Sequence, residues 1–217
     1  MRPLPPALID AAAGDALPAD CRGLLVRAGD SRIGGNFLLV QMDAGLEMLR
    51  PALAGGSAGI ILAGWRTGAD IQRLAALLSV AEAESGLADG ATPILALADG
   101  ILPPPASPHG LAGKSARLAA LIWDHHLLLR KLGARRTVTE NGEWTAAFAA
   151  ARAATLLAAA AAGLPAYDSL SEHVGAAFAT ECERSRDDGF SGRLARDPDE
   201  AAIISALYAP AAGSTRP

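Results

Sequence analysis

The residue types that most often carry chemistry are sparse in this sequence and follow no familiar spacing. Its two cysteines, Cys21 and Cys182, lie far apart and outside any CxxC or Cys/His pattern, so the sequence predicts neither a disulfide nor a zinc site. We find no phosphate-binding glycine loop, no GxSxG nucleophile turn and no HExxH motif. His109 and His173 stand alone, and we expect both at the surface. Local motifs therefore assign no reaction.

The composition indicates a globular α/β protein with one large domain. Of the 217 residues, 51% are hydrophobic but only 4% are aromatic, a balance typical of closely packed helices and parallel strands. A single β/α barrel of about 200 to 250 residues fits this length, so we expect one domain over residues 1–217. The net charge is −4 and no Lys/Arg cluster is present, which argues against a nucleic-acid partner because phosphate binding needs concentrated positive charge.

Short apolar runs alternate with longer amphipathic stretches, as in β/α units that build a parallel sheet. The predicted strands are residues 23–27, 59–62, 93–97 and 118–123, with weaker ones near Ala166 and Leu194. Each is continuously hydrophobic, as expected of strands covered on both faces. The predicted helices are residues 69–85, an alanine-rich helix that Thr139 or Asn141 could cap and that runs to Ala162, and residues 198–207.

The ends of the chain and its longest apolar stretch bear on location. Residues 1–15 hold one arginine followed by prolines and acids, so we expect residues 1–22 to form an irregular segment without a secretion signal, and we expect a flexible tail at 211–217. Residues 146–164 approach the length of a membrane span, but they are mostly alanine and include Arg152, which favours a buried helix. We therefore predict a cytoplasmic protein with no membrane partner, and the Ala, Gly and Arg usage suggests a bacterial source.

In order and spacing, several segments resemble the citrate lyase beta-subunit and HpcH/HpaI aldolase family, from about Leu24 to Pro210. These segments are GIILAGWRTGAD (59–70), LSVAEAESGLADG (78–90), LALADG (95–100), SARLAALIWDHHLLLRKLG (115–133), GLPAYD (163–168) and GFSGRLARDPDEAAIISALYAP (189–210). The resemblance implies a TIM-type (β/α) barrel and a divalent cation held by carboxylates at the C-terminal strand ends. The family's first strand has no clear counterpart, so we expect a barrel that is shortened or incomplete at the N-terminus, with its acidic strand end falling at best on residues 10–13.

The resemblance places the metal-binding carboxylates on Asp99 and, less directly, on Asp124. Asp99 stands where the family has a glutamate and keeps a carboxylate that can bind Mg²⁺ or Mn²⁺. The family's second carboxylate falls on Leu127, which cannot bind a cation. Asp124 either replaces it, with His125 and His126 beside it, or caps the following helix. Because adjacent histidines point in different directions on a helix, we do not expect two ligands from that pair.

The same resemblance implies roles for three further residues. Arg27 matches an arginine that binds the substrate carboxylate in relatives, and the alternative is an ion pair at a strand end. Asp168 matches the aspartate that ends the family's "Glp.iD" segment and is a catalytic candidate, the alternative being a helix cap. Arg193 replaces the family's lysine, keeps its charge, and is a candidate for cofactor binding. Near the C-terminus Asp197 replaces a histidine, which changes the acid–base range of that position.

Two functions remain open at this point. The first is a carbon–carbon lyase or aldolase that acts on a small acyl-CoA or 2-oxo acid. The second is a non-catalytic ligand-binding or accessory scaffold protein, which the loss of a carboxylate at Leu127 favours. The family's Pro-Lys pair is replaced by Ala63 and Gly64, so a cation is lost there unless Arg66 reaches back. An incomplete barrel would expose strand edges, so we also expect a homo-oligomer.

Overall fold

Eight short apolar strands close into a parallel barrel in the computed structural model of the chain, which describes residues 3–10, 21, 23–105 and 107–209. The strands are β1 (Ala7–Asp10), β2 (Leu24–Val26), β3 (Phe37–Gln41), β4 (Gly59–Ala63), β5 (Ile94–Ala98), β6 (Leu118–Trp123), β7 (Ala166–Asp168) and β8 (Gly192–Ala195). They lie side by side in chain order, and β1 pairs with β8 to close the ring. This confirms the predicted TIM-type fold class.

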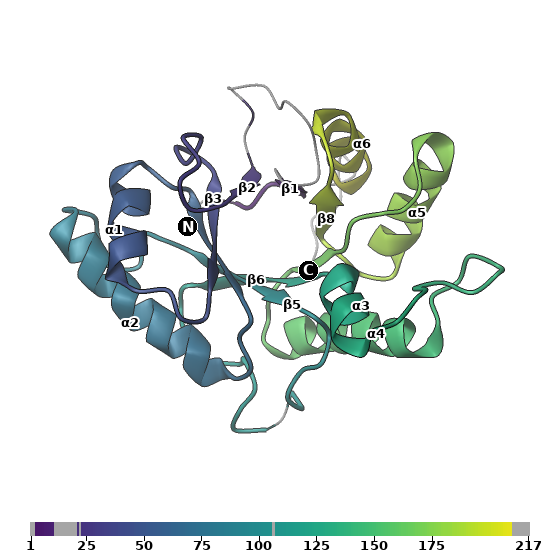
Figure 1. The fold of residues 1–217 in the computed structure, drawn as a ribbon, viewed down its shortest axis with the longest axis horizontal. Helices are drawn as coiled ribbons and strands as arrows, with labels where there is room; N and C mark the ends of the chain where they lie inside the picture. The colour runs from purple at the N-terminus through teal and green to yellow at the C-terminus, as the bar shows by residue number, and fades with distance from the viewer. Residues whose placement is uncertain (1–2, 11–20, 22, 106, 210–217) are drawn as a thin grey trace.

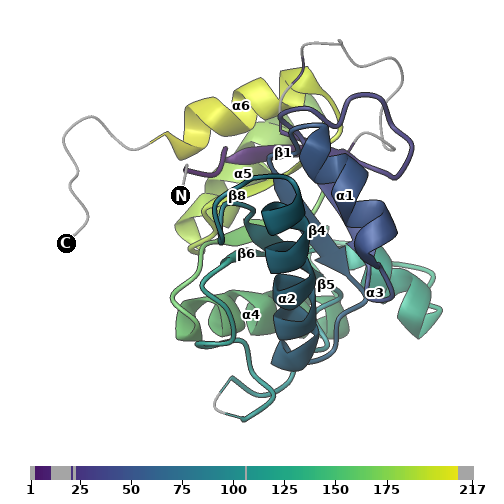
Figure 2. The same cartoon turned by 90° about the vertical axis from the view of Figure 1, so that its left-hand side faces the viewer.

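Helices surround the barrel, with α1 and α2 on one side and α3 to α6 on the other (Figure 1; Figure 2). Their bounds are α1 (Leu46–Ala54), α2 (Gly68–Glu84), α3 (His125–Leu132), α4 (Ala146–Ala161), α5 (Gly175–Asp187) and α6 (Pro198–Tyr208). Thr67 caps α2 through a reciprocal capping box with Asp70. Thr145 stands at the start of α4, so the predicted cap at Thr139 or Asn141 is wrong. In the described part of the chain, no helix combines the length and apolarity needed to cross a membrane.

Alternation along the strands produces two apolar layers. On β5, Leu95 and Leu97 point into the barrel, while Ile94, Ala96 and Ala98 pack outward against the helices. The same alternation on the other strands fills the interior with Leu8, Leu25, Phe37, Ile61, Ala120, Ile122, Tyr167 and Leu194. The barrel is therefore a packed core rather than a pore.

The closed ring corrects the expectation of a shortened barrel. The first strand exists: β1 lies inside the segment 1–22 that we predicted to be irregular, and it pairs with both β2 and β8. Its four residues follow three prolines and carry too short a pattern to be recognised locally. Among the strands of the described residues, closure leaves no open edge, so the reason we gave for a homo-oligomer no longer holds. Residues 11–13 and the tail at 211–217 lie outside the described residues.

Candidate functional site

The C-terminal ends of the strands turn polar side chains toward the mouth of the barrel. Side chains alternate along a strand, so the residue two positions after the last inward-facing apolar one points to the mouth. On β1, Leu8 is followed in this way by Asp10, and on β5 Leu97 is followed by Asp99. The same counting on other strands gives Arg27, Gln41, Asp124, Ser169 and Arg196. In barrels of this type, active sites lie at this end.

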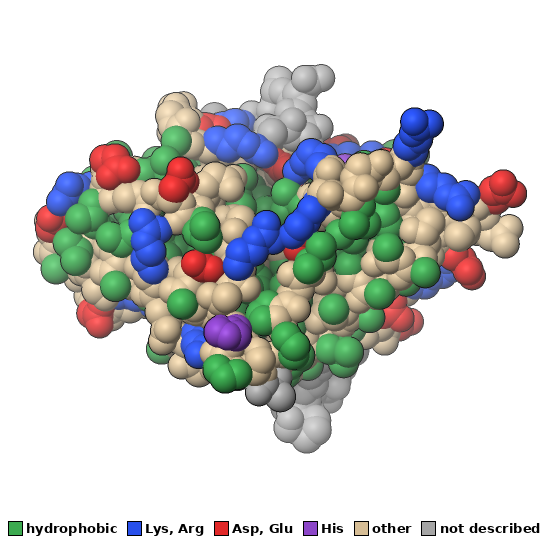
Figure 3. Space-filling view, turned by 60° about the horizontal axis from the view of Figure 1, so that its bottom comes forward, with side chains coloured by type: hydrophobic (Ala, Val, Ile, Leu, Met, Phe, Trp, Pro, Cys, Tyr) green, Lys and Arg blue, Asp and Glu red, His purple; other side chains and the backbone are tan. Residues whose placement is uncertain are grey.

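A cavity of about 370 Å³ lies at the mouth beside Asp99. Its lining includes Gln41 at the end of β3, Arg66 after β4, and Arg130 and Lys131 in the last turn of α3. Among the described residues that line it, three are cations and Asp99 is the carboxylate. Figure 3 views the molecule from the side of the β5–β6 loop and shows Lys and Arg side chains gathered across the middle of that face. The cavity therefore suits an anion.

Asp99 is bound by two of these cations. Lys131 Nζ lies 2.6 Å from its Oδ2 atom, and Arg66 Nη1 lies 3.3 Å from the same oxygen. Arg66 thus reaches back into the site, as the sequence left open. Burial alone would raise the pKa of Asp99, but the hydrogen bond from Lys131 and the nearby positive charges hold that pKa below its ordinary value. Asp99 is therefore an ionised carboxylate whose charge is already balanced.

Local sequence explains how Asp99 is held. Its Oδ1 atom accepts a hydrogen bond from the backbone N–H of Ile101, which forms a tight turn after β5. Gly100 allows this turn because its φ is +84, and a Cβ at this position would lie 2.5 Å from the Cβ of Ala151 on α4. Strand β5 and helix α4 therefore fix the position of Asp99 together.

The predicted magnesium site does not fit the residues present. Magnesium requires several hard oxygen ligands, and it would have to displace Lys131 and Arg66 from Asp99. Leu127 packs its side chain against the apolar interior of the barrel, where the resemblance expects a second carboxylate. Asp124 caps α3 by accepting the backbone N–H of His126, which is the helix-cap alternative for this residue. Asp99 is therefore engaged in ion pairs and Asp124 in a helix cap, so the two carboxylates do not form a magnesium site.

Beside Asp124, the two histidines at the start of α3 point the same way, which corrects our expectation that they diverge. Their ring centroids are 3.9 Å apart, and the Nε2 atom of each ring lies 3.3 Å from Oε1 of Glu172. Burial lowers the pKa of His125, whereas the hydrogen bond to Asp124 raises the pKa of His126. Ser169, at the end of β7, holds His125 through its ring and backbone nitrogens. Sequence reasoning missed Glu172 and Ser169, because both contacts span more than forty residues.

Arg27 lies at the mouth but in a different cavity from Asp99. Its Nη1 atom is 3.1 Å from Oδ1 of Asp10, so the ends of β2 and β1 are joined by an ion pair. It lines a hollow of about 430 Å³ between the β2–β3 connection and α1, together with Met48 and Ile33. The ion pair with Asp10 is the alternative that the sequence offered for Arg27.

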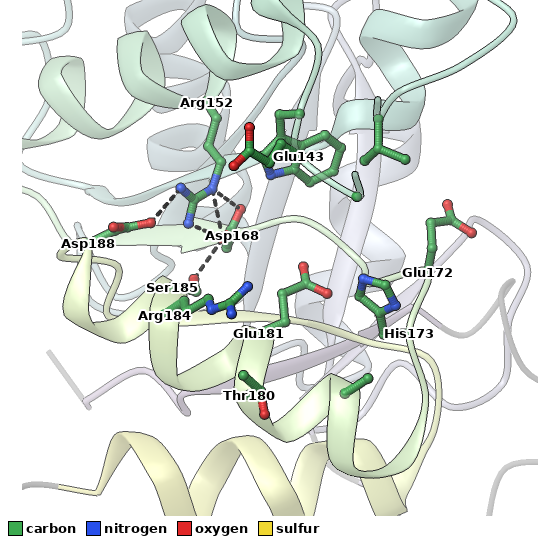
Figure 4. A pocket seen from close by; sticks show the side chains of 14 residues that line it. Glu143, Arg152, Asp168, Glu172, His173, Thr180, Glu181, Arg184, Ser185 and Asp188 are labelled. Carbon is green, nitrogen blue, oxygen red and sulfur yellow. Dashed lines mark hydrogen bonds and ion pairs between the residues drawn. The ribbon is translucent and has the colours of Figure 1, made fainter. Parts of the chain in front are cut away.

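Asp168 and Arg193 face away from the barrel interior. Asp168 follows the inward-facing Tyr167 on β7, and Arg193 precedes the inward-facing Leu194 on β8. Because side chains alternate along a strand, both residues point outward toward the helices. Asp168 accepts hydrogen bonds from Arg152 on α4 and Ser185 on α5 (Figure 4). The three form one wall of an open groove of about 450 Å³ between α4 and α5.

Arg193 is fully buried beside this groove. Its guanidinium donates to the backbone oxygen of Ser169 and, at 2.7 Å, to Glu181 on α5. Arg193 and Asp168 therefore join strands to helices, and neither lines the cavity at Asp99. His109 and His173 are exposed, as expected, and Asp197 caps α6.

No family model matches this chain, and no curated protein matches it. Solved structures do. CitE from Mycobacterium tuberculosis, in complex with magnesium, acetoacetate and coenzyme A, is 16% identical with a TM-score of 0.67, over 97% of this chain and 83% of that one. RipC from Yersinia pestis is 20% identical with a TM-score of 0.68, over 96% of each chain.

A third match is the citrate lyase beta subunit of M. tuberculosis complexed with oxaloacetate and magnesium. It is 16% identical with a TM-score of 0.65, over 95% of this chain and 98% of that one. At these identities the similarity concerns the fold, and at that level it confirms the resemblance seen in the sequence. The chain has the TIM-type barrel fold of the citrate lyase beta-subunit structures.

Proposed function

We propose that the protein is a carbon–carbon lyase or aldolase that binds a small 2-oxo acid or acyl-CoA in the cavity beside Asp99. The observation that carries this proposal is the placement of Arg66, Arg130 and Lys131 around one carboxylate at the barrel mouth. A volume of about 370 Å³ lies within the range of small-ligand sites and accommodates a molecule the size of pyruvate. Matches that bind acetoacetate with coenzyme A, and oxaloacetate, support the same ligand class.

Aldol cleavage explains what these side chains would do. In a 4-hydroxy-2-oxo acid, the C4 hydroxyl loses its proton, the C3–C4 bond breaks, and the electron pair moves to the C2 oxygen as an enolate. Protonation at C3 then releases pyruvate and an aldehyde. Arg130 would hold the substrate carboxylate, and Lys131 and Arg66 would stabilise the enolate oxygen. Asp99, which is ionised, would accept the hydroxyl proton and return it to C3.

Calorimetric titration with pyruvate and oxaloacetate tests the binding part of this proposal. Arg130 is exposed at the cavity and makes no ion pair with a described residue, so Arg130→Gln removes a binding cation without breaking a structural contact. A lost charged hydrogen bond of about 1.5–3 kcal/mol predicts an affinity loss of roughly tenfold or more. Arg135→Gln is the matched control, because Arg135 is exposed just beyond α3 and does not line the cavity. Equal effects of both substitutions would refute the assignment.

The second candidate is a non-catalytic ligand-binding or accessory scaffold protein. The packing of Leu127 against the barrel interior and the Lys131–Asp99 ion pair favour it, since both remove the oxygen ligands of a family-type metal site. Binding of pyruvate without any pyruvate release from 4-hydroxy-2-oxo acids or acyl-CoA cleavage would support this candidate. Turnover that Asp99→Asn abolishes would support the enzyme.

A further inference from the structure

A cluster of nitrogen and oxygen donors lies at the start of α3, apart from the cavity at Asp99. We propose that His125, His126 and Glu172 form a binding site for a divalent first-row transition-metal ion. His125 and His126 come from the first turn of α3, and Glu172 comes from the connection between β7 and α5. The proposal does not depend on the lyase activity.

The distances within the cluster fit a metal centre. Oε1 of Glu172 lies 3.3 Å from Nε2 of His125 and 3.3 Å from Nε2 of His126. An ion bound tetrahedrally at about 2.0–2.1 Å has ligand atoms about 3.3–3.4 Å apart. The carboxylate oxygen therefore already stands at ligand spacing from both imidazole nitrogens.

The other ring nitrogen of each histidine is held by a partner that orients it. Nδ1 of His125 lies 2.6 Å from the hydroxyl of Ser169, and Nδ1 of His126 lies 3.4 Å from Oδ1 of Asp124. Metal-binding histidines commonly donate their second N–H to an acceptor. With an ion bound, Ser169 and Asp124 would accept the Nδ1–H of the two rings, and the ion would take the place of a proton at Nε2. Asp124 is thus a positioning residue here rather than a ligand.

Donor type and exposure define the class of ion. Two imidazoles and one carboxylate match the preference of Zn²⁺, Co²⁺, Fe²⁺ or Mn²⁺, whereas Mg²⁺ prefers oxygen ligands alone. His125 is buried, but the side chains of His126 and Glu172 are 35% and 62% exposed. The open side leaves coordination positions for water or an exogenous ligand.

Cobalt is the most informative probe, because its visible absorption changes with the geometry and the ligands around the bound ion. Tag-free full-length protein, dialysed against chelator, is titrated with Co²⁺ by absorption and with Zn²⁺ by calorimetry. We expect one equivalent of each to bind, with the cobalt spectrum unchanged by a large excess of Mg²⁺. Both Glu172→Gln and His126→Gln should weaken binding by at least roughly tenfold. Asp124→Asn keeps a helix cap but loses the charge, and should weaken binding by about 10- to 100-fold.

His109→Gln is the matched control, since His109 is an exposed histidine on the β5–β6 loop whose backbone oxygen pairs with Gly68 at the start of α2. It should bind both metals like the wild type. Absence of saturable binding would overturn the proposal, as would undiminished binding by Glu172→Gln, whose exposed side chain can change without unfolding the protein. Loss of binding in His109→Gln would show that surface histidines bind the metal instead. None of these outcomes affects the test of pyruvate binding at Asp99, which is a separate titration.

Discussion

Replacing Asp168 by asparagine should destabilise the fold rather than alter ligand binding at the barrel mouth. The carboxylate of Asp168 is buried, and Arg152 donates to it through Nε and Nη2, the latter at 2.8 Å. The hydroxyl of Ser185 donates to it at 2.6 Å. Asparagine has nearly the same shape but carries no charge, so the substitution leaves Arg152 half-buried beside a neutral amide.

The expected loss follows from the cost of breaking a buried ion pair, about 3–5 kcal/mol. For a domain of this size, each kcal/mol lowers the melting temperature by about 2–4 °C, so we expect a decrease of roughly 6–20 °C. Asp188→Asn is the matched control. Asp188 binds the same arginine, at 2.7 Å, but its side chain is 53% exposed, and exposed pairs contribute about 0–1 kcal/mol.

The effect should also depend on pH. Burial alone would raise the pKa of Asp168, but Arg152 and Arg193 hold it below the ordinary value. A carboxylate with a lowered pKa in the folded state stabilises the protein above its unfolded pKa, about 3.9, and loses this contribution as pH falls further. The stability difference between wild type and Asp168→Asn should therefore be constant near neutrality and shrink below about pH 4.

Chemical denaturation of the three proteins at several pH values measures these differences. Equal stabilities of Asp168→Asn and Asp188→Asn would refute the structural role of Asp168. A normal stability with loss of pyruvate binding or turnover would instead restore Asp168 as a catalytic residue.

Three further predictions concern the fold and assembly. Glu82→Gln should lower the free energy of unfolding, measured in urea, by about 3 kcal/mol, because the buried Glu82 carboxylate lies 2.7 Å from Arg117. Glu84→Gln is the control and should change it by less than about 1 kcal/mol, because the Glu84–Arg50 pair is exposed. Gly100→Ala should lower both the melting temperature and the affinity for pyruvate, because the added Cβ would meet Ala151; we expect the free energy of unfolding to fall by about 2 kcal/mol or more. Gly86→Ala is the control and should lose less stability, because the space around Gly86 is open. The homo-oligomer stays a prediction that light scattering after size exclusion tests, and a monomer at all concentrations would contradict it.

The strands that could be predicted from the sequence are those with long, uninterrupted apolar runs. Leu118–Trp123 has the predicted bounds because all six residues are buried on both faces of the sheet. Strand β3, FLLVQ, ends in an exposed glutamine and follows a glycine-rich loop, and β1 has only four residues. Their strand state depends on pairing with neighbours, which local pattern does not report.

The candidate site was only partly predictable for a related reason. Asp99 could be placed at a strand end from its segment alone, but its partner Lys131 is 32 residues away and depends on the packing of α3 over the mouth. The two histidines were expected to diverge as on any helix surface. Instead Ser169, 44 residues away, binds His125, and Glu172 draws both rings to one side. Tertiary contacts, rather than helix geometry, set these orientations.

The most direct test of the barrel-mouth assignment is a crystal structure of the protein with pyruvate or oxaloacetate. We predict that the ligand carboxylate lies against Arg130, with the 2-oxo oxygen directed to Lys131 and Arg66 beside Asp99. A ligand bound instead in the groove between α4 and α5, or beside Arg27 at α1, would contradict this assignment.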